Sequence, residues 1–485
     1  MRALGLVICS VCCLCFLSGV SSADDLMPRL RAGLVKLRVN SQGYEQGQPW
    51  NRAAPTTSTS RGFVVGPGLI LTSANNVRNH ILIEVSEANS VRRYPAELKH
   101  VDYRAGLALV EITDPELRAR MKPLELGDPV KLDDEFDIYQ LGSDNMVERA
   151  NARVVRANAS STRLTLRLQA SGLAGGTGEI AVRDGKVVGL VTGTQASKQQ
   201  ATLLSIESIR HYVKDHDDGK YAGLPGGTIW WQPLLRDDLR TYYGLNKDQH
   251  GVAITRLGKD QTGHGVLMEG DVLTKIDGYD IDDEGRFTHE VHGRLSARYL
   301  LFGVKYAGET AKATVLRKGN PVEVEFKLKA IVPEKRLVPP TPVDTRPEFM
   351  IVGGLVIFEL NISLAKSMPR SPGGVVIRRY REHATWDPPV DRERVVYVDR
   401  VERHPSNKGY ETLTHAIIRT VNGKPISRIA DVAEALKTPQ DKYHVFTFEL
   451  DEVDFVMHAA ETEKINKALA ERYNIPRLRY LKGDE

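Results

Sequence analysis

Short apolar runs separated by turn residues dominate the first part of the chain. Examples are Gly62–Val65, Gly68–Thr72 and Leu107–Val110. Runs of this length bounded by turns are typical of β-strands, and several of them at close spacing predict a barrel or sandwich. We therefore expect a β-rich domain over residues 24–215, followed by the polar stretch Asp215–Lys220 as a linker.

A second pattern, over residues 224–330, mixes helix and strand. Its apolar spacing predicts a helix followed by strands, and Arg317–Asn320 has the composition of a hairpin turn between the last two strands. The residues that carry this pattern are Leu235, Leu239 and Tyr242 for the helix, and Gly251–Ile254, Gly270–Gly278, Ala311–Leu316 and Val322–Leu328 for the strands. We expect a small α+β domain here.

Residues 331–347 are rich in proline and charge, which favours an extended connector. Beyond it, Ala416–Ile426 repeats the hydrophobic order of Val272–Ile281, with an Asn-Gly turn in place of Asp-Gly, and the helix-like Ile429–Leu436 follows. These similarities predict a divergent repeat of the second domain, over residues 348–485.

Length, composition and charge agree with this organisation. A chain of 485 residues, 41% of them hydrophobic and 26% charged, is an ordinary globular protein of more than one domain. The 66 basic and 62 acidic residues leave a net charge of only +4. This nearly neutral net charge gives no indication that nucleic acid or an anionic membrane is a partner.

All 4 cysteines lie within the first fifteen residues, inside the apolar run Ala3–Val20 that follows Arg2. This run and the small residues Ser21–Ala23 are typical of a secretory signal at residues 1–23, although an uncleaved anchor of the same length is an alternative. We expect an exported protein of the periplasm or cell envelope, or a secreted one. After cleavage it would have no disulfide and no cysteine nucleophile.

Stretches in all three parts of the chain resemble, in order and spacing, one known family. They are Ser60–Val77, Ala96–Ile112 and Gln169–Gly178, then Tyr243–Leu245, Gly270–Leu273 and Tyr306–Glu309, then Pro347–Val356 and Tyr473–Pro476. They are similar to the HtrA/Deg family of trypsin-like serine proteases with PDZ domains, especially its plant-type branch with two PDZ-like domains. The resemblance implies a mostly β fold with some α: a trypsin-like double β-barrel followed by two PDZ-like α+β domains.

The resemblance also implies where the family's catalytic residues would stand. Asn75 takes the position of the general-base His, Gly106 that of the orienting Asp, and Ala174 that of the nucleophilic Ser. A methyl group cannot attack a carbonyl, a carboxamide is not basic near neutral pH, and glycine has no carboxylate to stabilise an imidazolium. We therefore expect a degenerate triad and a pseudoprotease.

A relocated triad is the alternative. Ser171 and Ser73 are the serines near the altered positions, and His80 and His100 are the nearest histidines. The simpler interpretation of each is a solvated loop residue. Moving the nucleophile to Ser171 would also break the Gly-x-Ser-Gly-Gly pattern.

The glycines of the nucleophile loop allow two interpretations. The backbone N–H groups around Gly172, Gly175 and Gly176 could still converge as a residual oxyanion hole that holds a carbonyl or carboxylate oxygen. Alternatively, these glycines form a flexible turn. The sequence favours the turn slightly.

Peptide binding is implied by the first PDZ-like domain, because PDZ domains add an extended peptide as a strand and receive its terminal carboxylate on backbone N–H groups. Glycines permit the backbone angles that such a loop requires, but Thr228 replaces a glycine of the family pattern. Side chains alternate along a strand, so one of Trp230 and Trp231 should face the core and the other the groove or solvent. The expected peptide-binding residues are Gly226, Gly227, Thr228, Ile229 and Trp230.

The last domain shows no clear carboxylate loop. By the resemblance it helps copies of the chain to assemble, so we expect a homo-oligomer. The apolar run Phe349–Phe358 is expected to form a buried strand pair, with an exposed interface as the alternative.

No cofactor or metal is expected. The motif His289–His292 lacks the one-turn histidine spacing of a zincin and more simply caps a loop, and Asp280–Glu284 lacks calcium-loop spacing. The expected partners are peptides or unfolded proteins and an active protease relative, and the expected role is that of a scaffold, a chaperone-like factor or a regulator. The rival hypotheses are an active serine endopeptidase with a relocated triad and a purely architectural envelope protein.

Overall fold

The structure is a computed structural model that describes residues 23–173, 175–217, 219–369, 372–383, 391–450 and 453–484. The expected signal segment, apart from Ala23, and the altered position Ala174 lie outside the described residues. Among the residues described, no helix is long and apolar enough to cross a membrane.

The first β-rich domain consists of two closed barrels of six strands each. Barrel 1 contains, in spatial order, β1 (Leu34–Ser41), β4 (Thr56–Gly66), β5 (Leu69–Ser73), β8 (Leu107–Ile112), β7 (Tyr94–Asp102) and β6 (His80–Glu87). Barrel 2 contains β10 (Val147–Ala159), β11 (Leu164–Ser171), β14 (Gln200–Ser205), β13 (Lys186–Gln195), β12 (Ile180–Arg183) and β9 (Glu135–Leu141). The strands predicted at Gly62–Val65, Gly68–Thr72 and Leu107–Val110 correspond to β4, β5 and β8, and the predicted mostly β double-barrel fold is confirmed.

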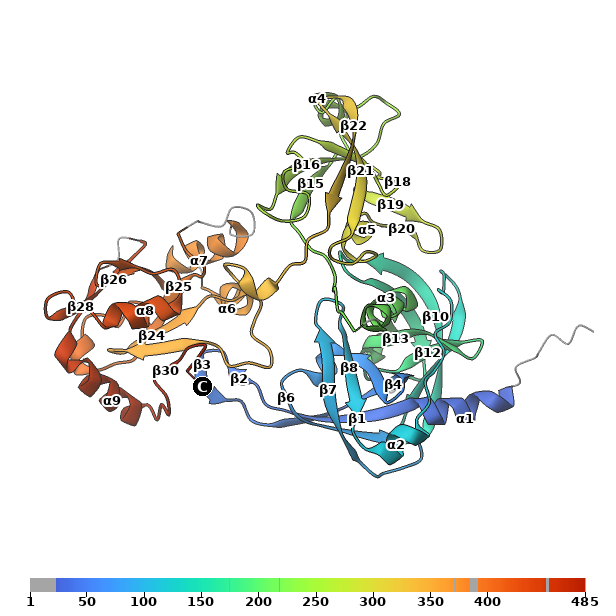
Figure 1. The fold of residues 1–485 in the computed structure, drawn as a ribbon, viewed down its shortest axis with the longest axis horizontal. Helices are drawn as coiled ribbons and strands as arrows, with labels where there is room; N and C mark the ends of the chain where they lie inside the picture. The colour runs from blue at the N-terminus through green and yellow to red at the C-terminus, as the bar shows by residue number, and fades with distance from the viewer. Residues whose placement is uncertain are drawn as a thin grey trace, which may run out of the picture.

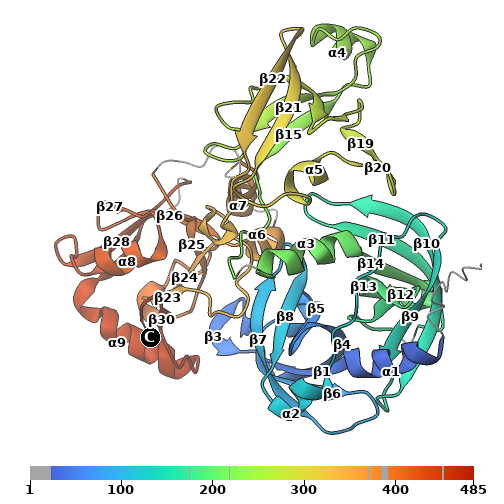
Figure 2. The same cartoon turned by 45° about the vertical axis from the view of Figure 1, so that its right-hand side comes forward.

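Alternation of apolar and polar residues explains why these strands close into barrels. Along β1, Val35, Leu37 and Val39 are fully buried, whereas Lys36 and Arg38 between them are partly exposed. The helices α1 (Ala23–Gly33), α2 (Pro115–Arg120) and α3 (Ile206–Asp217) lie on the outside of the barrels (Figure 2). A hairpin of β2 (Tyr44–Glu45) and β3 (Gln48–Arg52) projects from barrel 1.

The second unit is an antiparallel sheet with short helices. Its strand order is β15 (Ile229–Pro233), β16 (Val252–Leu257), β17 (Val272–Ile276), β21 (Thr310–Arg317) and β22 (Asn320–Lys327), with β18 (Tyr279–Asp280) paired to β17. Outside the sheet are α4 (Asp237–Tyr242), the hairpin of β19 (Arg286–His289) and β20 (Gly293–Ser296), and α5 (Arg298–Phe302). The predicted hairpin at Arg317–Asn320 joins β21 to β22, with left-handed backbone at Lys318 and Gly319.

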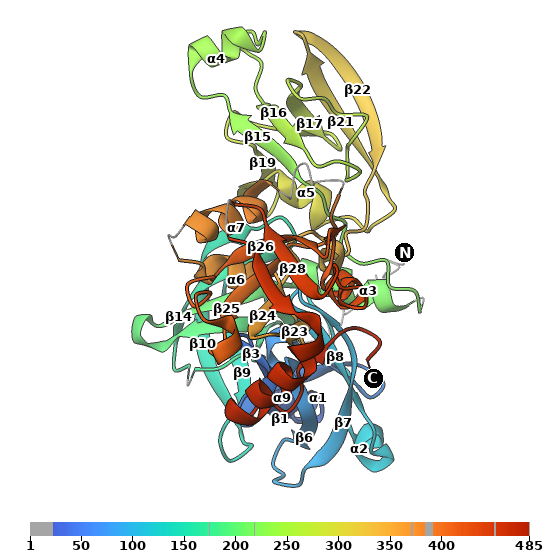
Figure 3. The ribbon, with the colours of Figure 1, turned by 90° about the vertical axis from the view of Figure 1, so that its left-hand side faces the viewer.

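The third unit has the same plan with added strands. Its order is β29 (Phe455–His458), β28 (Tyr443–Phe448), β26 (Ala416–Val421), β25 (Val396–Val401), β24 (Leu355–Glu359), β23 (Phe349–Val352) and β30 (Arg479–Tyr480), with β27 (Lys424–Pro425) paired to β26. The helices are α6 (Ile362–Ser367), α7 (Pro372–His383), α8 (Ile429–Leu436) and α9 (Thr462–Arg472). Figure 3 shows this unit in front of the barrels. The run Phe349–Phe358 forms the strand pair β23–β24, as expected.

The second and third units share strand pairings around the stretches predicted to be a repeat. In the second unit β17 pairs with both β18 and β21, and in the third unit β26 pairs with both β27 and β28. Both central residues of each tight turn, Asp277-Gly278 and Asn422-Gly423, have positive φ. This backbone suits Asn-Gly and Asp-Gly, which is why the two stretches share that signature.

The units pack against one another through apolar contacts. Ala159 and Leu164 of barrel 2 belong to the same buried cluster as the core of the second unit. Trp50 of the β2–β3 hairpin is buried in a cluster with Phe349 and Ile351 of the third unit. Figure 1 shows the three units arranged around the connector, with the β2–β3 hairpin beside the third unit.

Candidate functional site

The fold brings together Asn75 and Gly106, two of the three positions at which we expect an altered triad. Asn75 lies in a 3₁₀ turn, Ala74–Val77, directly after β5, and its side chain is exposed. Gly106 lies in the turn before β8 and is buried. The Ala74 N–H donates to the Gly106 carbonyl at 3.0 Å, so the two segments are in direct contact.

The surroundings of Gly106 leave little room for a side chain. Its φ is +77°, a left-handed backbone that favours glycine. A Cβ at this position would come within 2.6 Å of Nη1 of Arg163, which belongs to the β10–β11 turn. The guanidinium of Arg163 therefore lies beside Gly106, the position at which the resemblance implies the orienting carboxylate.

Ala174 itself is outside the described residues, but the loop around it is described. Gly172 and Gly175 have φ of +79° and +84°. The Gly176 N–H donates to Thr194 Oγ1 at 3.1 Å, so this N–H is already engaged. The left-handed backbone explains why the loop is rich in glycine.

Two polar contacts join this loop to barrel 1. Thr177 Oγ1 donates to Asn76 Oδ1 at 2.7 Å, and Asn76 Nδ2 donates to Thr72 Oγ1 at 2.9 Å. The Arg61 N–H donates to the Thr177 carbonyl at 3.1 Å. The nucleophile loop of barrel 2 is thereby tied to the 3₁₀ turn that carries Asn75.

An ion pair lies beneath the same loop. Arg61 Nη1 on β4 lies 3.3 Å from Glu179 Oε1, and the Glu179 side chain is fully buried. Arg61 Nε also donates to the Leu141 carbonyl at 3.0 Å. Burial raises the pKa of the Glu179 carboxyl, and a hydrogen bond with its own backbone and the nearby guanidinium offset only part of that effect.

In the described part of the chain, no hydrogen bond joins one of the serines considered for a relocated triad to one of the histidines. His80 Nδ1 is 2.9 Å from the Val77 carbonyl. His100 Nδ1 is 2.9 Å from Tyr212 Oη and 3.0 Å from His216 Nε2, in an aromatic cluster. Ser73 is 3% exposed, and Ser171 is on the exposed side of β11.

The expected carboxylate loop of the second unit is packed tightly. The Gly226 N–H donates to the Lys329 carbonyl at 2.9 Å, and Gly226 and Gly227 are absent from the residues with positive φ. A Cβ at Gly226 would come within 2.6 Å of Ile331 Cδ1, and one at Gly227 within 2.9 Å of Thr262 Cβ. The two glycines therefore serve close packing here and not the unusual backbone angles expected of them.

The two tryptophans after this loop behave as predicted. Trp230 is 54% exposed, whereas Trp231 is partly buried against the core of the second unit. Ile229 is fully buried and begins β15, and Thr228 is 8% exposed. Within the described sheet β15 pairs only with β16, so its other edge is not covered by a strand.

The third unit differs at the corresponding edge. By the repeat, β24 corresponds to β15, but β24 pairs with β25 on one side and with β23 on the other. All four residues of β23 are buried, from Phe349 to Val352. The chain therefore fills its own edge where a PDZ domain would accept a peptide strand.

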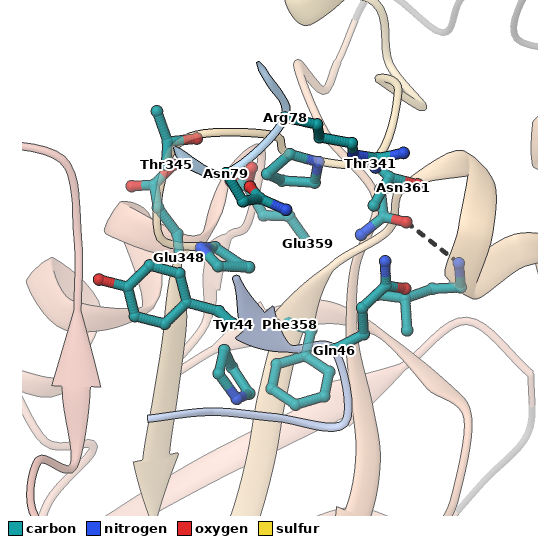
Figure 4. Close-up of a pocket in the computed structure, with 14 residues that line it drawn as sticks. Tyr44, Gln46, Arg78, Asn79, Thr341, Thr345, Glu348, Phe358, Glu359 and Asn361 are labelled. Atoms are coloured by element: carbon teal, nitrogen blue, oxygen red, sulfur yellow. Dashed lines mark hydrogen bonds between the residues drawn. The ribbon is translucent and has the colours of Figure 1, made fainter. Parts of the chain in front are cut away.

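The connector between the second and third units contacts the segments around Asn79 and Tyr103 in barrel 1. Asp344 Oδ2 accepts a hydrogen bond from Tyr103 Oη at 2.7 Å, and its N–H donates to Asn79 Oδ1 at 2.8 Å. A polar cavity of about 80 Å³ lies between this connector, the β2–β3 hairpin and the third unit. Figure 4 shows Glu348 and Glu359 among the residues that line it.

The His289–His292 motif caps a loop, as expected. His289 Nδ1 accepts from the Val291 and His292 N–H groups at 3.2 and 3.4 Å. His292 Nε2 contacts Glu207 Oε1 of α3 at 2.6 Å, which joins the second unit to barrel 2. In the described part of the chain, no group of three or more His, Cys, Asp or Glu side chains is arranged to hold a metal ion.

Sequence reasoning missed the residues that link the barrels and units. One signal was available for Glu179, because a lone acid stands between the glycine loop and the apolar run Ile180–Val182. Trp50 stands alone in a polar stretch, which could have marked it as a contact residue. Asn76, Thr177 and Asp344 carry no sequence signal for the contacts that link the barrels and units, since their partners in those contacts are at least a hundred residues away.

Comparisons with known proteins agree with this architecture. A family model for a PDZ domain matches residues 338–480. The chain is 26% identical to Protease Do-like 2, chloroplastic, of Arabidopsis thaliana, over 91% of this chain and 74% of that protein. It is 24% identical to Protease Do-like 4, mitochondrial, of the same plant, over 88% of this chain and 81% of that protein.

Among solved structures, a variant of the HtrA-type protease AlgW with a decapeptide matches with a TM-score of 0.51 and 15% identity, over 66% of this chain and 99% of that chain. At this identity the match speaks for the fold alone. Two six-stranded barrels, a match to a PDZ-domain model and similarity to plant Do-like proteases over about nine tenths of the chain are together the features of HtrA/Deg-type trypsin-like proteases with PDZ domains, which this chain resembles.

Proposed function

We propose that this HtrA/Deg-like protein is a pseudoprotease that binds peptides or unfolded protein segments without cleaving them. The observation that carries the proposal is the contact between the Asn75 turn and Gly106. These two segments adjoin each other, yet one offers a carboxamide and the other no side chain. No group at either position can take up a proton or hold an imidazole.

The altered Ala174 supports the same proposal from the sequence. Removing the serine nucleophile of subtilisin lowers turnover by about 10⁶, even with the oxyanion hole intact. In this chain the Gly176 N–H already donates to Thr194, and Arg163 lies beside Gly106. Restoring one catalytic side chain would therefore not rebuild the site.

Peptide binding is assigned to the second unit. Its β15 has an edge that no described strand covers, and strand addition at such an edge is how PDZ domains hold extended peptides. The corresponding edge of β24 in the third unit is covered by β23. We assign to the third unit the role of holding the chain together and of assembling copies, so that multivalent binding strengthens weak contacts.

The protein would act after export, with residues 1–23 as a signal, as a chaperone-like scaffold or as a regulator of an active relative. Two rivals remain testable. An active endopeptidase with a relocated triad would cleave substrates, and a purely architectural component would neither cleave nor bind peptides.

The test combines turnover with capture. Purified protein is incubated with unfolded casein, while aggregation of heat-denatured citrate synthase is followed by light scattering with and without the protein. We expect no casein fragments and a delay in aggregation that depends on protein concentration. Casein cleavage would overturn the proposal in favour of an active enzyme. Absence of both cleavage and delay would overturn it in favour of an architectural role.

Variants of the sheet distinguish peptide binding at the β15 edge from nonspecific binding of unfolded protein. Trp231→Pro removes a backbone N–H that faces the open edge of β15, because the bonds of Thr228 to Gly258 and of Ile254 to Asp271 fix the alternation of N–H directions along the strands. Trp231→Ala controls for the loss of the indole, and Glu323→Pro removes an N–H that faces the open edge of β22 at the opposite side of the sheet. Thermal unfolding of each variant shows whether the sheet remains folded. We expect Trp231→Pro to lose the delay in aggregation and Glu323→Pro to keep it.

A further inference from the structure

The second unit contains a half-buried arginine without an acidic partner among the described residues. Arg298 is the first residue of α5, and its Nη1 donates to the main-chain carbonyl of Ile229. Its guanidinium carbon lies 4.0 Å from the centroid of the Trp231 ring. Burial lowers the pKa of this guanidinium, and no neighbouring carboxylate offsets the effect.

Five of the six other arginines described in this unit have a carboxylate partner. Arg317 pairs with Asp271 at 2.8 Å, Arg240 pairs with Asp283 at 2.6 Å, and Arg286 pairs with Glu284 at 3.2 Å. A desolvated cation without a counter-ion is costly unless other groups compensate for it. Arg298 has only a carbonyl and an aromatic ring for this purpose in the described contacts, so an anion would complete its surroundings.

The position of Arg298 places it on the path of a bound peptide. Ile229 is the first residue of β15 and follows the expected carboxylate loop. A peptide added antiparallel to β15 would have its C-terminal end near Ile229. The guanidinium is bonded to that residue, so it lies at the C-terminal end of the added strand.

The loop that receives the carboxylate in other PDZ domains has fewer free backbone N–H groups here. The Gly226 N–H is engaged by the Lys329 carbonyl, and Thr228 replaces a glycine. A carboxylate arriving at this end of β15 would find a smaller set of backbone donors. A guanidinium in the same place offers a planar fork of donors that matches a carboxylate.

The Arg298 guanidinium is also held in place before a ligand arrives. It lies over the ring of Trp231, and the Nε1 edge of this indole packs closely against Gly285, where an added Cβ would come within 2.5 Å. A fixed donor loses less conformational entropy on binding than a free side chain does. The stacking therefore favours recognition of a carboxylate in a defined position.

We propose that Arg298 is the carboxylate receptor of the second unit and selects peptides that present a carboxylate near their C-terminal end. This inference rests on the proposed peptide binding by β15 and specifies the class of peptide. The carboxylate can be the terminal group of the chain or the side chain of an Asp or Glu near the terminus. Both sources share one chemistry, and the experiment distinguishes them.

The test measures binding of fluorescein-labelled nonapeptides to the purified protein by fluorescence anisotropy. The peptides have a Ser/Val background in which one Asp is moved through the last five positions, and each is made with a free C-terminus and as an amide. Matched peptides carry Asn in place of Asp. If the terminal group is the ligand, amidation weakens every peptide. If a side chain is the ligand, exchange of Asp for Asn weakens the peptide at one position only.

Three variants assign the effect to Arg298. In Arg298→Gln the side chain can still donate to Ile229 but carries no charge, and we expect about ten- to a hundred-fold weaker binding of the preferred peptide, the range of a charge-assisted hydrogen bond. Arg298→Lys keeps the charge and should recover part of the affinity. Lys327→Ala removes the same charge on β22, at the far edge of the sheet, and should leave binding unchanged.

The outcomes separate this inference from the proposed function. If no peptide binds, the peptide-binding function itself fails. If neutral amidated peptides bind as tightly as acidic ones, or if Arg298→Gln binds the acidic peptide like the parent protein while unfolding at the same temperature, peptide binding stands and the inference about Arg298 is overturned.

Discussion

The buried ion pair between the barrels offers the sharpest stability prediction. Arg61→Met would leave the fully buried Glu179 carboxylate without its guanidinium partner. Removing one member of a buried pair typically costs about 3–5 kcal/mol, because the remaining charge is desolvated and uncompensated. At about 2–4 °C per kcal/mol for a domain of this size, the midpoint of thermal unfolding should fall by roughly 6–20 °C.

A double variant tests whether the loss comes from the orphaned charge. Arg61→Met with Glu179→Met replaces the pair by apolar side chains of similar length. Such replacements are often close to neutral, so most of the lost stability should return. Differential scanning calorimetry at pH 7 compares the parent protein, the two single variants and the double variant.

The pH dependence of the stability of the Arg61→Met variant tests the same explanation independently. Burial raises the pKa of Glu179 above its value in the unfolded chain. The penalty for the ionised carboxylate is therefore complete above the folded pKa and disappears as the pH falls toward about 4.3, the ordinary value for Glu. The gap in unfolding midpoint between parent and variant should narrow from pH 7 to pH 4. A gap that is absent at pH 7, or that the double variant does not reduce, would refute the reasoning.

Further predictions concern the contacts between units. Trp50→Ala, which removes a 7% exposed ring from the core of the third unit, should cost about 3–5 kcal/mol and speed thermolysin cleavage of the connector. Asp344→Ala, which removes the acceptor for Tyr103 Oη, should raise amide hydrogen exchange in the connector while changing stability by only about 1 kcal/mol. Burial and the neighbouring His216 lower the pKa of His100, so stability present above about pH 6.5 is lost as the pH falls through the lowered value. The unfolding midpoint of His100→Gln should therefore fall less between pH 7.5 and pH 5.5 than that of the parent protein.

Local pattern was sufficient to predict much of this fold. The strands around Phe63, Ile70 and Leu109 follow from apolar runs between turns, and the repeated hairpins follow from Asp277-Gly278 and Asn422-Gly423. In each case the information lies within a few neighbouring residues. Turn chemistry and alternation dictate the conformation before any tertiary contact forms.

Contacts between distant segments could not be predicted in the same way. Arg61 and Glu179 are 118 positions apart, and Asn79 and Asp344 are 265 positions apart. Neither pair has a local signature, because each residue would be equally acceptable on a solvated surface. The third unit makes the same point, since only the folded sheet reveals that β23 fills the edge of β24.

The sequence indicates which residue types stand at the candidate site, but it does not indicate which residues surround them. The register of the family pattern predicts Asn75 and Gly106 at two triad positions, and this assignment stays a prediction. That Gly106 has a left-handed backbone with Arg163 beside it depends on a turn from the other barrel. The packing of Gly226 against Ile331 likewise depends on a segment about a hundred residues away.

The proposed function requires that this protease-shaped protein lack a working nucleophile. Its most direct test is incubation with a fluorophosphonate probe at pH 8, followed by intact-mass and peptide mass spectrometry, with trypsin as a positive control. We predict an unmodified protein under conditions in which trypsin is fully labelled. A single labelled serine whose replacement by Ala abolishes cleavage of casein would contradict it.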